Sequence, residues 1–366
     1  MGKIRVLVVD DSVVVRRVVT DALAGDPDVI VAATAPNGRI ALAKIPQITP
    51  DLITLDIEMP DMDGLTALAA IRKDYPRLPV IMFSTLTRRG AVSTLDALAA
   101  GATDYVTKPT ALAGSSALAF VRAELLPRIK ALCVRALVPA ARPAATPASH
   151  LPRLAPAGEP GSVDVLAIGV STGGPNALAD LLPTLPADFP VPVVIVQHMP
   201  PMFTRLLAER LDARSPLRVL EAAPGEVVEP GTIWIAPGDF HMVVQRDGTR
   251  VRLATHQGPA ENSCRPSVDV LFRSVADIYG AGTLGVVLTG MGQDGLLGAE
   301  RIREHGGRLL VQDEATSVVW GMPGFVANAG LADAVLPLET LGPAIVRRVS
   351  LGRAAVSAAV EATAGI

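Results

Sequence analysis

Several acidic and basic residues are spaced so that they could bind a divalent cation and accept a phosphoryl group. Asp10, Asp11, Asp56 and Lys108 each follow a short apolar run of the kind that forms a β-strand. Because the carboxyl ends of parallel strands meet at one edge of a sheet, we expect these side chains to converge. Gathered carboxylates repel one another unless a cation is present, which favours a hard ion such as Mg²⁺. A carboxylate beside such an ion can attack a phosphoryl donor while the lysine neutralises the phosphoryl oxygens.

Ser84 extends this arrangement, because it follows another apolar run and could donate a hydrogen bond to the new phosphoryl group. Acidic residues also occur at strand ends by chance or for solubility, and a lone aspartate would favour that interpretation. The coincidence of carboxylates, a serine and the Lys108-Pro109 pair at successive strand ends favours a phosphoryl site instead.

A G-x-S-x-G sequence at residues 169–173 could expose a nucleophilic serine. It lies between an expected strand and an expected helix, where the turn exposes the Ser171 hydroxyl and the helix N-terminus offers N–H groups to an oxyanion. The rival interpretation is a degraded G-x-G-x-x-G dinucleotide turn. It is disfavoured because the second glycine is replaced and because Asp188 precedes the next strand instead of ending it.

A nucleophilic serine needs a base and a carboxylate that orients the base. His198 directly follows the apolar run 191–196, and Asp294 follows the run 284–289. The order serine, histidine, aspartate differs from that of the α/β-hydrolases, so we expect a different fold.

The other histidines and Cys264 fit structural roles better. His150 lies in a proline-rich stretch, His305 ends a helix, and His241 and His256 lie near expected hairpin strands. For Cys264 we favour a packed thiol over a residue that lines a pocket.

The elements that would position these groups alternate between strand and helix in both halves of the chain. In the first half, strands are expected at 5–9, 29–33, 52–55, 80–83 and 105–106, with helical patterns between them. This alternation predicts a parallel sheet with helices on both faces. Residues 139–162 are rich in proline and alanine and predict a linker.

The second half again predicts an α/β fold. Strands are expected at 164–169, 191–196, 284–289 and 308–311, the last two on either side of a helix at 295–304. Shorter runs at 233–236, 242–245 and 251–254 suggest antiparallel additions, including an edge hairpin.

Composition excludes several classes of function. The chain of 366 residues has a net charge of −3, and residues 163–366 carry 15 basic against 21 acidic side chains with no lysine. A nucleic-acid-binding role is therefore not expected. The longest uncharged run is broken by glycines and proline, so we do not expect the protein to be embedded in a membrane. Two distant cysteines fit a reducing cytoplasm.

The first half resembles a response-regulator receiver domain with a flavodoxin-like fold. The resemblance rests on Val8-Val9-Asp10-Asp11-Ser12, Leu55-Asp56-Ile57-Glu58-Met59-Pro60, Met62-Asp63-Gly64 and Thr107-Lys108-Pro109. It implies that Asp56 accepts a phosphoryl group from a chemotaxis histidine kinase. It also implies that Mg²⁺ is held by Asp11, Asp56 and the Glu58 carbonyl, with Asp10 assisting through water. Ser84, Tyr105 and Lys108 match the positions of the phosphorylation switch.

The second half resembles the methylesterase domain of the chemotaxis protein-glutamate methylesterase family. The motifs are Ser171-Thr172-Gly173-Gly174-Pro175, Gln197-His198-Met199, Ala236-Pro237-Gly238, Cys264-Arg265-Pro266-Ser267-Val268-Asp269 and Thr289-Gly290-Met291-Gly292 with Asp294-Gly295. The resemblance implies Ser171 as nucleophile, His198 as base and Asp294 as its orienting carboxylate. It implies that the Met291 N–H helps to hold the oxyanion and that Thr172 and Gly173 line the pocket, with no cofactor for this reaction.

The expected domains are thus a receiver (1–138), a linker (139–162), a methylesterase domain (163–353) and an alanine-rich tail (354–366). The expected function is phosphorylation-activated hydrolysis of glutamate γ-methyl esters, and deamidation of glutamines, on methyl-accepting chemoreceptors in the cytoplasm. A phosphorylation-switched adaptor and a receiver-driven transcription factor are the alternatives. The acidic second half disfavours the transcription factor.

Overall fold

The computed structural model describes residues 2–109, 115–133 and 162–364, and no side chain is described beyond residue 351. The chain divides into two compact units, residues 1–148 and 149–366. The linker expected at 139–162 lies, except for Ser162, outside the described residues.

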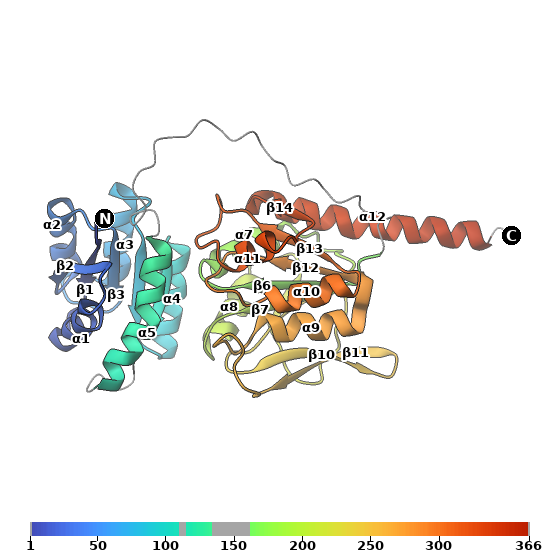
Figure 1. Ribbon diagram of the computed structural model, residues 1–366, viewed down its shortest axis with the longest axis horizontal. Helices are drawn as coiled ribbons and strands as arrows, with labels where there is room; N and C mark the ends of the chain where they lie inside the picture. Colours follow the sequence, from blue (N-terminus) through green and yellow to red (C-terminus); the bar gives the residue numbers. More distant parts are fainter. Residues whose placement is uncertain (1, 110–114, 134–161, 365–366) are drawn as a thin grey trace. The chain divides into compact units, whose positions relative to one another are not determined.

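The first unit is a five-stranded parallel sheet with helices on both faces (Figure 1). Its strand order β2-β1-β3-β4-β5 is that of the flavodoxin-like fold, as the sequence predicts. The strands are β1 (Ile4–Val9), β2 (Val29–Ala35), β3 (Leu52–Asp56), β4 (Val80–Ser84) and β5 (Asp104–Thr107), and the helices are α1 (Val13–Ala24), α2 (Gly38–Ile48), α3 (Gly64–Asp74), α4 (Arg88–Ala99) and α5 (Ser115–Leu132).

Short polar side chains begin four of these helices. Ser12, Asn37, Asp63 and Thr87 each accept a hydrogen bond from a backbone N–H of the following first turn. These caps satisfy donors that a helix start would otherwise leave unpaired. Because Ser12 comes directly after Asp10 and Asp11, the cap of α1 keeps the acidic loop short and close to the sheet edge.

The second unit is built on a seven-stranded parallel sheet of order β14-β13-β12-β6-β7-β9-β8. Its strands are β6 (Val165–Val170), β7 (Val193–Gln197), β8 (Arg218–Glu221), β9 (Thr232–Ile235), β12 (Thr283–Val287), β13 (Arg308–Gln312) and β14 (Ala334–Leu336). The helices are α7 (Gly174–Leu181), α8 (Phe203–Asp212), α9 (Val268–Tyr279), α10 (Leu296–Glu304), α11 (Met322–Asn328) and α12 (Leu338–Ala364). The central strands are buried along their whole length, which explains their continuous apolar sequences.

Two details of the second unit differ from the sequence predictions. The run at 233–236 is not antiparallel, because β9 pairs in parallel with both β7 and β8. The sequence of a four-residue apolar strand does not indicate whether it pairs in parallel or antiparallel. Its direction depends on the path of the connecting segments before and after it. The hairpin does form, from β10 (His241–Asp247) and β11 (Arg250–His256), but as a separate two-stranded sheet and not on an edge of the main one.

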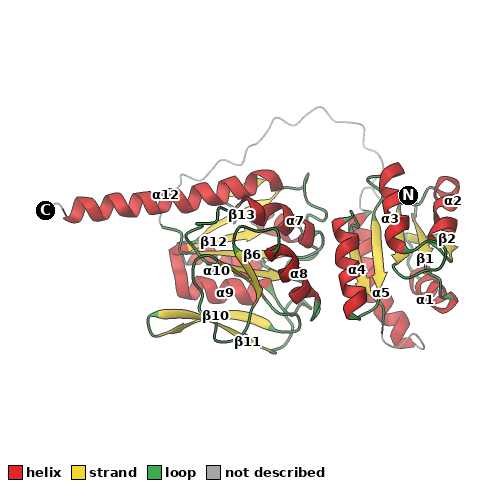
Figure 2. Ribbon diagram, turned by 180° about the vertical axis from the view of Figure 1, so that it is seen from behind, coloured by secondary structure: helices red, strands yellow, loops and turns green. Residues whose placement is uncertain are grey.

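Helices α9, α10 and α11 cover one face of the main sheet, and α7 and α12 lie on the other (Figures 1 and 2). The hairpin packs against α9, where the Val244 N–H donates to Ser274 Oγ at 3.1 Å. Helix α12 continues to Ala364 and so runs through the boundary expected at residue 353. Among the described residues, no helix combines the length and apolar character that crossing a membrane requires.

Candidate functional sites

The predicted acidic residues of the first unit meet at the carboxyl edge of its sheet. Lys108 Nζ lies 2.8 Å from Asp10 Oδ2 and 2.8 Å from Asp56 Oδ1, so one ammonium group bridges two buried carboxylates. A carboxylate oxygen from each of Asp10, Asp11 and Asp56 lies within 4.8 Å of the other two. An oxygen-only donor set of this kind fits a hard cation such as Mg²⁺.

Burial perturbs the acid–base properties of this pocket. Desolvation raises the pKa of Asp56 to about 6, and the neighbouring Asp10 adds to the increase while Lys108 opposes it. Desolvation likewise raises the pKa of Asp10. Both carboxylates therefore favour an added positive charge, which is the electrostatic condition that a cation would satisfy.

The other predicted residues of the receiver lie around the same pocket. A cavity of about 290 Å³ is lined by Asp11, Asp56, Glu58, Ser84 and Lys108, among others. The Ser84 hydroxyl donates to the Gly90 carbonyl at 3.2 Å in the first turn of α4. The exposed Glu58 side chain lies 3.5 Å from Arg89.

Tyr105 lies on β5, which β4 separates from β3 and Asp56. It is half-buried, and burial raises the pKa of its hydroxyl.

In the second unit, three predicted site residues follow three neighbouring strands. Ser171 follows β6, His198 follows β7, and Asp294 lies in the loop after β12, and these strands are adjacent in the order β12-β6-β7. Backbone hydrogen bonds tie the loops together, because the His198 N–H donates to Val170 O at 3.1 Å and the Ser171 N–H to Thr289 O at 3.0 Å.

The serine loop is tightly packed against its neighbours. Gln197 Nε2 donates to the Ser171 carbonyl at 3.0 Å, and Thr289 Oγ1 donates to the Thr172 carbonyl at 2.9 Å. Gly173 has a φ of 79°, and a Cβ there would lie 2.6 Å from Val318 Cγ2. The glycine is therefore required both by its backbone conformation and by the side chain that covers it.

The loop that contains Met291 passes beside the serine. A Cβ placed on Gly290 would lie only 2.8 Å from Ser171 Cβ, so the Gly290 backbone approaches the serine closely. Among the residues that the structure describes, the Met291 N–H has no hydrogen-bond acceptor.

Asp294 is held at the N-terminus of α9 by an extensive set of donors. Its Oδ1 accepts hydrogen bonds from Ser267 Oγ (2.8 Å), Asn262 Nδ2 (3.0 Å) and the Asp269 N–H (3.2 Å). Its Oδ2 accepts from the Val268 N–H (2.7 Å) and from His198 Nε2 (2.8 Å). Burial alone would raise the pKa of Asp294, but the bonds to His198 and to the helix N-terminus outweigh it and lower the pKa. The residue is thus an ionised, acceptor-only carboxylate.

This carboxylate determines the state of His198. Because Asp294 can only accept, the Nε2 of His198 carries a proton and donates it, which leaves Nδ1 as the nitrogen that can take a proton. Burial acts to lower the pKa of His198, but the hydrogen bonds with Asp294 and Cys264 outweigh it and raise the pKa.

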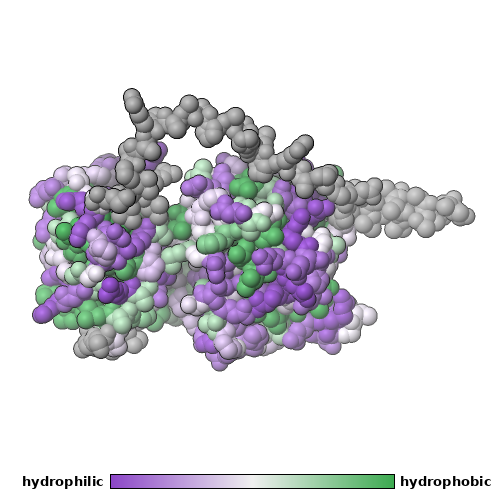
Figure 3. Space-filling view, in the orientation of Figure 1, coloured by the Kyte–Doolittle hydropathy of each residue, from purple (hydrophilic) through white to green (hydrophobic). Residues whose placement is uncertain are grey.

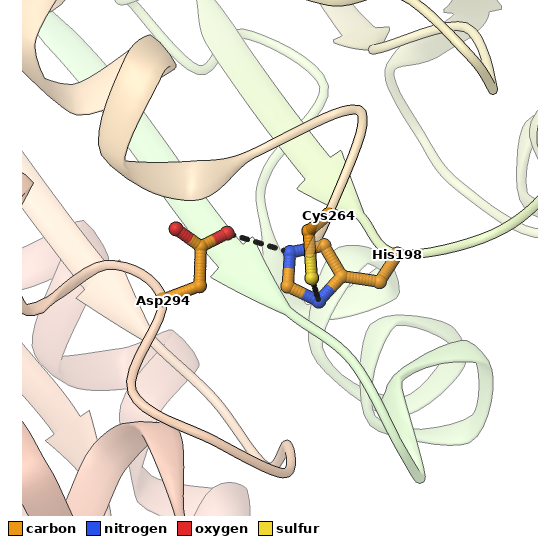
Figure 4. A group of neighbouring side chains, drawn as sticks. All are labelled: His198, Cys264 and Asp294. Atoms are coloured by element: carbon orange, nitrogen blue, oxygen red, sulfur yellow. Dashed lines mark hydrogen bonds and ion pairs between the residues drawn. The ribbon is translucent and has the colours of Figure 1, made fainter. Parts of the chain in front are cut away.

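Cys264 lies beside the ring nitrogen of His198 that does not face Asp294 (Figure 4). Its Sγ is 3.6 Å from His198 Nδ1, and the residue is only partly buried. The thiol is thus packed against the imidazole and also contacts the Asn262 carbonyl at 3.4 Å. The described residues contain no hydrogen bond between the Ser171 hydroxyl and His198.

Sequence reasoning did not single out several residues that support this site. Ser267, Asn262 and the α9 N-terminus hold Asp294, and buried His241 in turn accepts the Ser267 N–H at its Nδ1 (3.2 Å). These residues fall in or near the motif that includes Cys264 and Asp269, but the motif alone gives no individual roles. His305 lies apart from this site: its Nδ1 is 2.9 Å from the Arg301 carbonyl at the end of α10, and its Nε2 is 3.6 Å from Asp277 Oδ1.

An exposed apolar side chain covers the serine loop, because Val318, which packs on Gly173, is 41% exposed. Figure 3 shows hydrophobic atoms gathered in patches among hydrophilic ones on the visible face of this domain.

Comparison with known proteins matches both halves of the chain. Residues 166–345 match the family described as CheB methylesterase, and residues 6–114 match the response regulator receiver domain. A protein-glutamate methylesterase/protein-glutamine glutaminase of Trichodesmium erythraeum is 53% identical over 361 residues, which cover 95% of this chain and 100% of that protein. One from a Nocardioides species is 54% identical over 360 residues, covering 96% of this chain and 97% of that protein.

A solved structure agrees with the sequence relatives. The crystal structure of the Thermotoga maritima CheB methylesterase catalytic domain matches with a TM-score of 0.50 and 44% identity, over 51% of this chain and 98% of that one. Both domains match known families, and relatives of nearly the same length contain the same two domains in one chain. The chain belongs to the protein-glutamate methylesterase/protein-glutamine glutaminase family and joins a response-regulator receiver domain to a CheB methylesterase domain.

Proposed function

We propose that this chain hydrolyses glutamate γ-methyl esters of chemoreceptors to glutamate and methanol, and deamidates selected receptor glutamines. Ser171 acts as nucleophile, His198 as general base and Asp294 as the carboxylate that orients it. The observation that supports this assignment most strongly is the anchored His198–Asp294 pair, in which Asp294 binds Nε2 of His198 and the His198 N–H donates to Val170, the residue before Ser171.

The reaction follows from the protonation states at the site. Ser171 Oγ attacks the side-chain carbonyl carbon of the substrate while His198 Nδ1 takes the hydroxyl proton. The proton then passes to the leaving methanol, or to ammonia from a glutamine, and an ester forms between the substrate and Ser171. Water deprotonated by His198 cleaves this ester and releases glutamate. Asp294 stays ionised throughout and stabilises the imidazolium.

The tetrahedral oxyanion needs donors that are fixed before the reaction. We assign one to the Met291 backbone N–H, which follows the Gly290 backbone that packs on Ser171. Thr172 and Gly173 form the opposite wall of the pocket. Removal of a single oxyanion donor typically raises the barrier by about 3 kcal/mol.

The receiver half supplies the control. We propose that a chemotaxis histidine kinase donates a phosphoryl group to Asp56, with Mg²⁺ held by Asp11, Asp56 and the Glu58 carbonyl, and by Asp10 through water. The cation would neutralise charge on the phosphoryl oxygens. Lys108 would contact the same oxygens. Ser84 would turn its hydroxyl from the Gly90 carbonyl to the phosphoryl group, and loss of this hydrogen bond would let the first turn of α4 move.

Movement of this turn changes the face that contains Tyr105. We propose that this change relieves the inhibition that the unphosphorylated receiver places on the esterase domain. The reaction takes place in the cytoplasm, on the cytoplasmic helices of the receptors.

The test measures methanol release from methylated receptor by the full chain, with and without a small-molecule phosphodonor and Mg²⁺. The Ser171→Ala variant should lose hydrolysis while it keeps its fold. The Asp56→Asn variant should keep its basal rate and lose the stimulation by the phosphodonor. Hydrolysis by Ser171→Ala at the unmodified rate would refute the nucleophile assignment, and equal stimulation of Asp56→Asn would refute the switch.

A further inference from the structure

We propose that Cys264 Sγ and His198 Nδ1 form a binding site for a thiophilic divalent cation, with Zn²⁺ as the best match, and that occupancy of this site inhibits the esterase. The metal site itself rests on the geometry around Cys264. Its inhibitory consequence rests on the proposed role of His198 as general base.

The distance between the two donor atoms fits a shared metal ion. In tetrahedral zinc sites the Zn–S and Zn–N distances are about 2.3 and 2.05 Å, which places the two ligand atoms about 3.5 Å apart. Cys264 Sγ and His198 Nδ1 are 3.6 Å apart, so the ligands need hardly move. A thiolate and a neutral imidazole are also the donors that zinc selects over the harder Mg²⁺.

The other nitrogen of the imidazole is already oriented as in metal sites. Zinc-bound histidines usually donate their second N–H to a carboxylate, which fixes the ring and strengthens the ligand. Here His198 Nε2 donates to Asp294 Oδ2 at 2.8 Å, and Asp294 is in turn fixed by the start of α9. Nδ1, the nitrogen that Asp294 does not bind, is therefore the one that lies beside Cys264 Sγ.

The thiol is held in position by its own loop. Glu261 and Cys264 exchange backbone hydrogen bonds of 3.1 and 2.8 Å, and the two residues between them, Asn262 and Ser263, have left-handed φ angles of 50° and 62°. This tight turn places the partly exposed Cys264 beside the imidazole of His198. The His198 side chain is 12% exposed. The pair therefore borders solvent on the side of Cys264.

Occupancy would remove the base from the reaction. The cation takes the lone pair of Nδ1 that otherwise accepts the serine proton, and binding releases the thiol proton of Cys264 to solvent. Two protein ligands leave the remaining positions to water, unlike the four ligands of structural zinc sites, so binding should be reversible by a chelator.

The chain provides a matched control for the cysteine. Cys133 is the only other cysteine, and it is buried in the core of the first unit, where burial raises the pKa of its thiol to about 12. The carboxylates of the receiver offer oxygen only, so they cannot produce a thiolate–metal absorption band.

The first experiment measures binding without turnover. Co²⁺ is added to the full chain in excess Mg²⁺, which keeps the receiver site filled, and the thiolate-to-cobalt charge-transfer band is recorded and then displaced with Zn²⁺. Unmodified protein and Cys133→Ala should show the band at one cation per chain, whereas Cys264→Ser and His198→Gln should not. Absence of the band in unmodified protein, or its persistence in Cys264→Ser, would overturn the proposal.

The second experiment measures methanol release against free Zn²⁺, with each variant normalised to its own rate without zinc. The concentration for half-inhibition should rise at least about tenfold in Cys264→Ser and stay unchanged in Cys133→Ala. Binding without inhibition would refute the inhibitory role alone. A chain that binds the cation but hydrolyses no ester would instead refute the proposed function, so the two failures are distinguishable.

Discussion

Replacement of Asp294 by asparagine tests the centre of the proposed mechanism. The carboxylate accepts five hydrogen bonds, three at Oδ1 and two at Oδ2, and an asparagine can accept at one oxygen only. If its oxygen keeps the three donors, its amide group faces the Val268 N–H and His198. The imidazole must then accept at Nε2 and carry its proton on Nδ1, which is the wrong nitrogen for a base.

Two magnitudes follow. Hydrogen bonds to a charged group contribute about 1.5–3 kcal/mol each, so loss of the two at Oδ2 should lower the free energy of unfolding by about 3–6 kcal/mol. The wrong tautomer should lower kcat by about 10⁴-fold, as the equivalent change does in a serine-protease triad. Urea unfolding measures the stability, and methanol release from methylated receptor, at a temperature where the variant is folded, measures the rate.

Ser267→Ala is the matched control. It removes one donor to Oδ1 and leaves the His198 contact intact, so stability should fall by about 1.5–3 kcal/mol while the rate falls less than tenfold. A folded Asp294→Asn variant that keeps more than a tenth of the normal rate would refute the tautomer argument. So would a loss of rate in Ser267→Ala as large as that in Asp294→Asn.

Two further predictions concern pH and packing. His198 must be neutral to take a proton, and its pKa is raised. Hydrolysis should therefore decline as pH falls, with a midpoint above the ordinary histidine pKa of 6.5. A pH–rate profile with a midpoint below 6.5 would contradict this. Gly169→Ala should lower the free energy of unfolding by about 1–3 kcal/mol in urea, since its Cβ would lie 2.3 Å from Val268 Cγ1, and unchanged stability would show that α9 moves aside freely.

The two α/β folds could be predicted because strands and helices alternate along the sequence. A parallel sheet brings the carboxyl ends of its strands to one edge, so residues just after the apolar runs must meet there, as Lys108 meets Asp10 and Asp56. The same rule places His198 beside the segment that contains Ser171.

The contact of Cys264 with His198 could not be predicted in this way. It joins residues 66 positions apart through an irregular loop, and no periodic pattern indicates which way such a loop folds. The direction of β9 escaped prediction for a related reason, because four apolar residues pair equally well in either sense until the rest of the sheet is assembled.

The order of strands in the large sheet has a consequence for how this protein can change. The strands that carry the reacting groups, β12, β6 and β7, are flanked on both sides, whereas β8 and β14 form the margins. Thermal opening of a sheet begins at its margins, so hydrogen exchange should be slowest in the strands beneath the site. Substitutions that loosen β8 or β14 can therefore accumulate while the reacting groups keep their alignment.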